Sequence, residues 1–337
     1  MSRYATLRVL AWLVRDTFRQ SLDSRVFGMM LTLSGLGILT CLSISVQGGA
    51  PLHRPDERPD FLPRTASSAE RTLAPRDGVD IANGSMSLAF GAFRIPLGRD
   101  AQDAIQFIQL VLATAAADTV GLLMALVWTA GFLPAFLAPG AVTVLLAKPV
   151  PRSLLLLGKY IGVITFVAFQ AVVFFLGTWT ALGVRTGIWD ASYLWGIPLL
   201  VHQFALFYSV STLIAACRKR TVACLFGSLL FWFLCWGTNY GRHAVVALPE
   251  LNREIAPLSP WLRGSVEVSY WVLPKPADLS LILSHAIDAE RHFATVPEFE
   301  TVRRIHRFHP VLSVLSSLAT ACLILAAAAR KFATTDY

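Results

Sequence analysis

The chain has 337 residues, of which 55% are hydrophobic and only 15% are charged, and its formal net charge is +8. Because a soluble domain of this size needs more polar surface, this composition excludes an ordinary water-soluble protein. In lipid the backbone must satisfy its own hydrogen bonds, which leaves only α-helices and closed β-barrels. The apolar residues come in runs of about 20, as spanning helices do, rather than in alternating segments of about 10. We therefore expect an all-α membrane protein.

Residues 1–25 predict an amphipathic helix that lies in the membrane interface. One side of this helix is apolar and carries Leu10, Leu13, Val14 and Phe18. The other side carries Arg8, Trp12, Arg15 and Arg19. A cleaved signal peptide is the alternative interpretation. The charged region before the first apolar run is long and contains Asp16 and Asp23, which differs from the short basic start of a signal peptide.

Residues 26–337 are predicted to form one transmembrane domain with six spans. The spans are expected at about 26–46, 110–132, 155–182, 193–216, 221–241 and 311–329. Two long polar segments, 47–103 and 242–309, follow the first and the fifth span. We expect both segments on the extracytoplasmic side of the membrane.

Both polar segments contain weaker structural signals. In the first, MSLAFGAF and FRIPL could form short strands or an interfacial layer. In the second, residues 266–286 are moderately apolar, but Pro274, Lys275, Pro276 and Asp278 interrupt them. A seventh span tolerates such a break poorly, so two short interfacial helices around a kink are the better prediction.

Lysine and arginine are distributed unevenly about the predicted spans. Six spans place both termini on one side of the membrane. The loops and tails on that side carry 13 basic and three acidic residues, whereas those on the other side carry 16 basic and 17 acidic residues. Basic residues gather on the cytoplasmic side of membrane proteins. We therefore predict a multi-pass protein of the cytoplasmic (inner) membrane with both termini in the cytoplasm. We attribute the net positive charge to this membrane topology, and we expect no nucleic-acid partner.

Motifs of nucleotide or metal chemistry are absent from the sequence. There is no G-x-x-x-x-G-K-[ST], and Gly158-Lys159-Tyr160 lacks both the upstream glycine and the hydroxyl. No H-E-x-x-H, G-x-S-x-G or Cys/His ligand spacing is present either. We therefore expect a chain that is not an enzyme and that binds no cofactor or metal itself.

The segment between the second and third spans is the most informative part of the sequence. Residues 138–162 read APGAVTVLLAKPVPRSLLLLGKYIG, in which a short apolar helix precedes a turn stiffened by Pro149 and Pro151. Such a stiff, partly apolar elbow on the cytoplasmic side suits docking to a cytosolic partner. An ordinary loop with snorkelling Lys and Arg anchors is the alternative.

The pattern LLAKPVPRSLLLLGKYIG resembles the cytoplasmic loop of type-2 ABC transporter permeases. The amphipathic N-terminal helix, the six spans and the short basic tail, here Arg330-Lys331-Phe332, fit the same family. The whole plan is also similar to the permease of nitrous-oxide reductase maturation systems.

This resemblance implies a permease that pairs with a second copy or a homologue, and with two ABC ATPase subunits that bind ATP and Mg. The elbow helix would be a coupling helix seated on the ATPase, and substrate would meet the dimer interface formed by spans 1, 2 and 5. The implied coupling residues are Val142, Leu145, Leu146, Lys148, Pro149, Pro151, Arg152, Gly158 and Lys159.

Two polar residues inside predicted spans are candidates for contact with a substrate or an ion. Asp118 could contact either one, or could lie hydrated near the outer interface. His202 could relay protons, or could pack against a neighbouring helix.

Three functions fit these features. The first is an exporter of an unidentified substrate. The second is a force transmitter that acts on an extracytoplasmic partner protein without moving a solute, which the long outer segments favour. The third is a membrane-embedded enzyme or scaffold without an ATPase, which the lack of a paired catalytic group disfavours.

Overall fold

A computed structural model describes residues 3–23, 25–47, 84–97, 101–138, 140, 150–252, 259–287 and 297–335. The longer helices are α1 (Arg3–Asp23), α2 (Arg25–Leu42), α3 (Ala101–Val111), α7 (Arg152–Thr186), α8 (Gly196–Arg218), α9 (Thr221–Leu251), α10 (Pro260–Val272), α11 (Pro276–Ala286) and α13 (Pro310–Thr334). The shorter ones are α4 (Leu122–Thr129), α5 (Phe132–Phe136) and α12 (Pro297–Arg304). A π-helix, η3 (Leu112–Gly121), joins α3 to α4, and the 3₁₀ turns are η2 (Ala89–Gly91) and η4 (Ala191–Trp195).

Within the described residues, five helical stretches are long and apolar enough to cross a bilayer. They are Ala104–Phe136, Arg152–Thr186, Ala191–Arg218, Thr221–Leu251 and Pro310–Thr334. A sixth crossing results if α1 and α2, which are bent by 76° relative to each other, count as one span. The prediction of an α-helical protein with several spans is confirmed, and the five later predicted spans each lie within one of these stretches.

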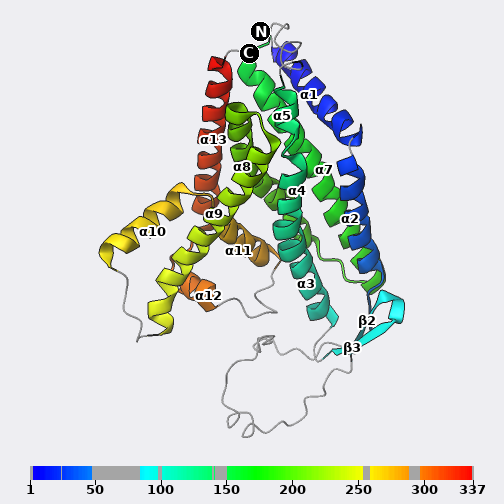
Figure 1. Ribbon diagram of the computed structural model, residues 1–337. Coiled ribbons are helices and arrows are strands. Elements are labelled where there is room, and N and C mark those ends of the chain that lie inside the picture. The colour runs from blue at the N-terminus through cyan, green and yellow to red at the C-terminus, as the bar shows by residue number, and fades with distance from the viewer. Residues whose placement is uncertain are drawn as a thin grey trace.

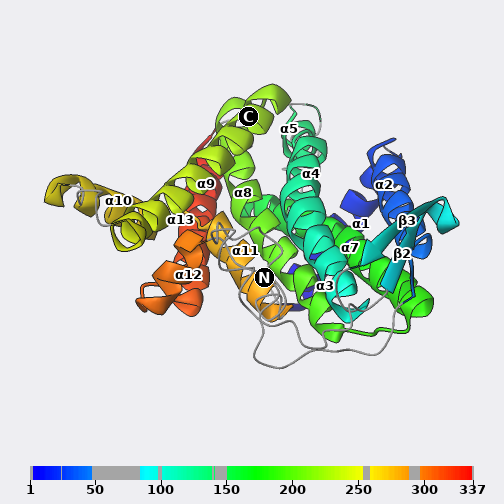
Figure 2. The same ribbon diagram turned by 90° about the horizontal axis from the view of Figure 1, so that it is seen from below.

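Helix α7 contacts α1, α2, α8 and α13. Its large buried side chains Phe166 and Phe175 join Phe204 and Phe207 of α8 in the main hydrophobic core. Figure 1 shows both chain ends at one end of the bundle and the strands at the opposite end. We call these the terminal end and the strand end. Figure 2, viewed from the strand end, shows α10 and α12 set to one side of the other helices.

A three-stranded antiparallel sheet follows α2. Its strands are β1 (Ser45–Gln47), β2 (Gly84–Leu88) and β3 (Phe93–Leu97), in the order β1-β2-β3. Met86 of β2 stands opposite Val46 on one neighbour and Ile95 on the other. The short strands expected in MSLAFGAF and FRIPL are therefore present. The first predicted span was set too long, because the helix ends at Leu42 and the chain continues as β1.

Helix α1 has the two faces that its sequence predicts. Leu13, Thr17 and Ser21 are fully buried, whereas Arg15 and Arg19 are exposed. The buried face packs on the first turns of α7. The residues on this face are thus covered by protein.

The second polar segment begins later than predicted. Helix α9 continues past Gly241 to Leu251, so residues 242–251 belong to the fifth helix. The reason is that Arg242 and His243 are buried and paired with other side chains, so their polarity does not end the helix. Beyond it, α10 and α11 are two short helices separated at residues 273–275, as the interrupted pattern predicts.

Candidate functional site: a buried polar cluster around Asp278

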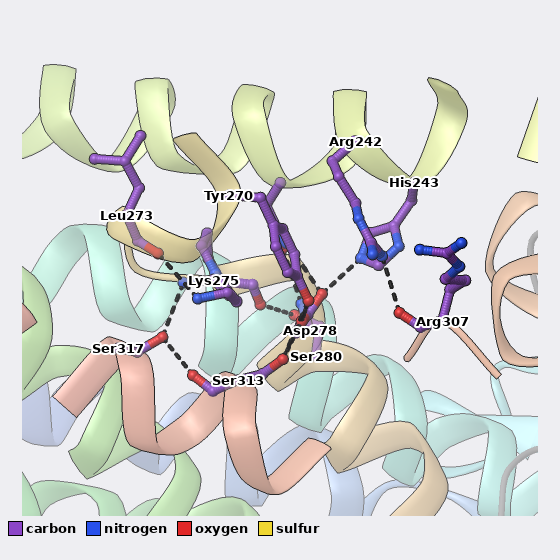
Figure 3. A network of polar contacts seen from close by, with 12 residues as sticks. Arg242, His243, Tyr270, Leu273, Lys275, Asp278, Ser280, Arg307, Ser313 and Ser317 are labelled. Carbon is purple, nitrogen blue, oxygen red and sulfur yellow. Dashed lines mark hydrogen bonds and ion pairs between the residues drawn. The ribbon is translucent and has the colours of Figure 1, made fainter. Parts of the chain in front are cut away.

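Four helices, α9, α10, α11 and α13, converge on the side chain of Asp278 (Figure 3). Asp278 lies in the first turn of α11, which Pro276 begins. Proline is favoured there because its missing N–H has no partner at a helix start. The preceding Lys275 is not helical, so the chain turns sharply between α10 and α11 and buries this carboxylate.

The carboxylate of Asp278 accepts hydrogen bonds from four side chains. The donors are His243 Nε2 at 2.6 Å, Tyr270 OH at 2.6 Å, Asn239 Nδ2 at 3.0 Å and the hydroxyl of Ser313. Burial alone raises the pKa of Asp278, but the hydrogen bonds from His243, Ser313 and Tyr270 hold that pKa below its ordinary value. The group is therefore an ionised carboxylate.

The ring nitrogen of His243 that donates follows from this geometry. Both side chains are fully buried, and the Asp278 oxygen can only accept, so His243 Nε2 is the atom that donates. His243 Nδ1 has no hydrogen-bond partner among the described residues.

Arg242 connects three parts of the chain. Its Nε and Nη2 each donate to Glu267 of α10 at 3.2 Å, and its Nη1 donates to the Arg307 carbonyl before α13 at 3.1 Å. The guanidinium also lies 4.4 Å from the centre of the Tyr270 ring. Although burial alone raises the pKa of Glu267, the hydrogen bonds and charge of Arg242 bring it below its ordinary value.

Lys275 is a second buried cation in the cluster, with 1% of its side chain exposed. Its Nζ donates to Ser316 Oγ at 2.7 Å and to the Leu273 carbonyl at 3.3 Å. The same nitrogen lies 4.8 Å from the centre of the Tyr270 ring. Burial lowers the pKa of Lys275 to about 8, against the opposing effect of the Asp278 charge.

This arrangement joins helices and differs from a nucleophilic site. In a Ser-His-Asp triad the serine donates to the histidine, whereas here Ser313 and His243 both donate to Asp278. Among the residues that the structure describes, no group of three His, Cys, Asp or Glu side chains could hold a metal ion. The chemistry that the cluster provides is a set of balanced, fully bonded charges at a four-helix junction.

The structure places Asp118 near this cluster and His202 apart from it. Asp118 is 4% exposed and accepts a hydrogen bond from Ser280 of α11. The interpretation of a hydrated residue at the outer interface is therefore wrong, because α11 covers the carboxylate. His202 on α8 is half-buried, and its Nε2 has no partner within the described part of the chain.

The predicted coupling residues are only partly described. Val142, Leu145, Leu146, Lys148 and Pro149 lie outside the described residues. Pro151 is exposed, and Arg152 Nη1 donates to the Thr335 carbonyl at 2.7 Å, which ties the start of α7 to the end of α13.

Gly158 and Lys159 are buried against α1. Lys159 Nζ reaches Asp16 at 3.2 Å and Gln20 at 2.8 Å, and Gly158 packs beneath Leu13. Their part in coupling remains a prediction, and it would act through α1.

Sequence reasoning missed the Asp278 cluster because the fifth span was ended too early. Two signals point to it. Asn239, Arg242 and His243 share one face of a helix, and Ser313, Ser316 and Ser317 form a polar stripe at helical spacing in the last span. Intramembrane polar stripes mark helix contacts or functional sites.

No family model matches the chain, and a search of curated proteins finds no match.

Proposed function

We propose that this chain is the membrane subunit of a type-2 ABC exporter, driven by a separate ATPase on the cytoplasmic side of the inner membrane. The resemblance of residues 138–162 to the permease loop is the sequence support. The observation that carries the proposal is the position of α7. This helix begins directly after the turn at Pro149 and Pro151, and it contacts α1, α2, α8 and α13. A displacement of that turn by the ATPase would therefore be transmitted to most of the bundle through one helix.

Pairing with a second permease is supported by the uncovered apolar face of α9. Val222, Phe226, Leu230 and Phe233 are all largely exposed. A second copy, or a homologous permease, would cover this face where the family resemblance expects span 5 to meet its partner. In this assembly the two ATPase subunits bind ATP and Mg, and the permease contributes no catalytic residue.

The test replaces Leu145 and Leu146 together with Asp. If these leucines dock on the ATPase, each loses about 1.5–3 kcal/mol of apolar burial, before the cost of a desolvated charge. The ATPase should then fail to co-purify from native membranes, or should hydrolyse ATP without coupling. Phe90 and Phe93, exposed at the strand end, provide the matched control, because their replacement with Asp adds the same charges far from the elbow.

A milder effect is expected for Pro149→Ala, which softens the elbow without removing contact surface. Full ATPase binding and coupled activity in the double Asp variant would show that the elbow is not the coupling element.

A force transmitter acting on an extracytoplasmic partner is the second candidate, and the Asp278 cluster favours it. The cluster ties α10, α11 and the start of α13 to α9, so these short helices would move with α9 as one unit. Trp261 at the start of α10 is 79% exposed and could meet such a partner.

A photo-crosslinking amino acid at Trp261 should then capture one discrete extracytoplasmic protein in whole cells. The same residue placed at Val184, exposed at the predicted outer end of α7, provides the control. Equal capture at both positions, or none at Trp261, would count against force transmission.

A further inference from the structure

The apolar face of helix α1 is the face that an interfacial helix would ordinarily turn toward lipid. In this protein α7 covers it. Leu10 and Leu13 lie over Gly158, and the Phe18 ring meets that of Phe166 edge-on, with 5.8 Å between the ring centres. Figure 1 shows α1 on the outside of the bundle at the terminal end. The opposite face of α1 is therefore the one that meets the surroundings of the protein.

That opposite face carries a row of arginines. Arg8, Arg15 and Arg19 are all exposed, and their spacing places them on one side of the helix. We call them the arginine row, which is about 16 Å long at the usual rise per residue of a helix. Asp16 lies on the flank of α1 and pairs with Lys159 of α7 at 3.2 Å. This carboxylate is therefore engaged elsewhere, and the row presents three positive charges to the outside.

Large apolar side chains accompany the arginine row. Trp12 and Leu22 lie on the same face and are 43% and 58% exposed, and Leu7 beside it is 63% exposed. Tryptophan favours the headgroup level of a bilayer, and leucine favours the acyl chains next to it. A lipid surface offers phosphates and hydrocarbon side by side, so it matches both kinds of side chain on this face.

We propose that the arginine row binds the phosphate groups of anionic phospholipids at the terminal end of the bundle. A guanidinium can donate two parallel hydrogen bonds to one phosphate, which a neutral polar side chain cannot do. Each basic residue at an anionic membrane surface adds about fivefold in affinity, so three give a preference on the order of 100-fold. This inference requires only that the apolar helices lie in a membrane, and it is independent of the ABC proposal.

The test measures lipid binding to the purified full chain in detergent, without the ATPase, by native mass spectrometry. Phosphatidylglycerol is the anionic probe, and phosphatidylcholine is the probe without net charge. Replacing all three residues of the arginine row with Gln should weaken phosphatidylglycerol binding by about tenfold or more. Phosphatidylcholine binding should not change.

A matched control removes the same charge from the same end of the molecule. Arg218, Arg220 and Arg330 are also exposed there, but they lie outside α1. Their replacement with Gln should leave phosphatidylglycerol binding within about twofold of that of the unchanged chain. Equal losses in the two triple variants would show that the overall charge attracts the lipid, and would overturn the proposal.

Two further measurements separate lipid from other partners. Glycerol 3-phosphate has a phosphate but no acyl chains, so it should not displace phosphatidylglycerol at equal concentration, and displacement would contradict a lipid site. The arginine-row variant should still co-purify with any ATPase that the unchanged chain captures from native membranes. Loss of that ATPase with full phosphatidylglycerol binding would assign this face of α1 to the ATPase, and would also overturn the proposal.

Photo-crosslinking keeps the test valid if the arginine-row variant does not fold. Diazirine-labelled phosphatidylglycerol and phosphatidylcholine are compared in liposomes that contain the unchanged full chain. The ratio of phosphatidylglycerol labelling to phosphatidylcholine labelling should be higher on α1 than at Phe226 and Leu230, which are exposed on α9. The same ratio on both helices would mean that α1 has no preference for anionic lipid, and the proposal would fail.

Discussion

Asp278 shows how a single buried charge can hold four helices together. Four donors from three other helices end on its carboxylate, while Lys275 and Arg242 supply positive charge nearby. A buried charge that loses its partners is far more costly than an exposed one. The cluster is therefore expected to move as a unit, whatever motion the bundle makes.

Replacing Asp278 with Asn should destabilise the fold strongly. The variant keeps the shape but removes the charge that four donors require, at a cost of about 3–5 kcal/mol. Glu250→Gln is the control, since that carboxylate is exposed at the end of α9 and its replacement should cost less than about 1 kcal/mol. Thermal unfolding in detergent measures both. Similar melting temperatures for the two variants would contradict the central role of Asp278.

Lys275 predicts a specific pH dependence. Its folded pKa, about 8, lies below the ordinary 10.5, so between these two values Lys275 binds more protons in the unfolded chain than in the folded one. The contribution of Lys275 to the free energy of unfolding should therefore rise with pH, by on the order of 1–2 kcal/mol between pH 7.5 and 9.5. The raised pKa of Tyr270, caused by burial and by the Asp278 charge, acts in the opposite direction, but only above about pH 10.

The variant Lys275→Met tests this dependence. The melting temperature of the unchanged chain, measured relative to that of the variant in detergent, should rise between pH 7.5 and 9.5. A difference between the two proteins that stays constant over this range would mean that Lys275 does not titrate there.

Helices α1 and α7 pack closely against each other. Gly158 and Gly162 of α7 form a small-xxx-small groove into which Leu13 and Thr17 of α1 fit. A Cβ atom on Gly162 would lie 2.6 Å from Thr17 Oγ1 and 3.3 Å from the Leu13 carbonyl. Backbone cannot give way there as a side chain can, so the groove sets how closely α1 approaches.

Gly162→Leu should therefore displace α1 from α7. We expect faster trypsin cleavage at the exposed Arg15 and Arg19 and a lower melting temperature. Gly35→Leu on α2 is the control, because nothing lies within 4 Å of a Cβ placed there. If Gly162→Leu and Gly35→Leu are cleaved at the same rate, the groove does not hold α1.

The whole molecule has two chemically different ends. The terminal end carries the basic run Arg218-Lys219-Arg220 and the tail pair Arg330-Lys331. The strand end carries the sheet and the far end of α9. In the bilayer this asymmetry predicts that the terminal end faces the cytoplasm.

Labelling with a membrane-impermeant thiol reagent checks this orientation. Cysteines placed at the exposed Ala92 and His309 should react in intact cells, whereas one at the exposed Ala333 should react only after lysis. The exposed native Cys217, close to the basic run, should behave like Ala333→Cys. Reaction of Ala333→Cys from outside would reverse the topology.

The sequence by itself determined that the chain forms several long apolar helices and which residues of α1 form its two faces. A bilayer forces each apolar run of about 20 residues into a helix, because no water can bond to its backbone. That rule is local, so it applies before any helix meets another. The break at Pro274 and Pro276 was readable for the same reason, since proline acts on its own turn.

Only the tertiary structure decided where the polar residues act. Asp278 depends on Asn239, Tyr270 and Ser313, which come from three different helices. The side chain of Gln170 likewise donates to Met30 and Ser34 of α2, which lie far away in sequence. Burial and pairing are properties of the packed bundle, so Arg242 is a loop residue by composition and an interior helical residue in the fold.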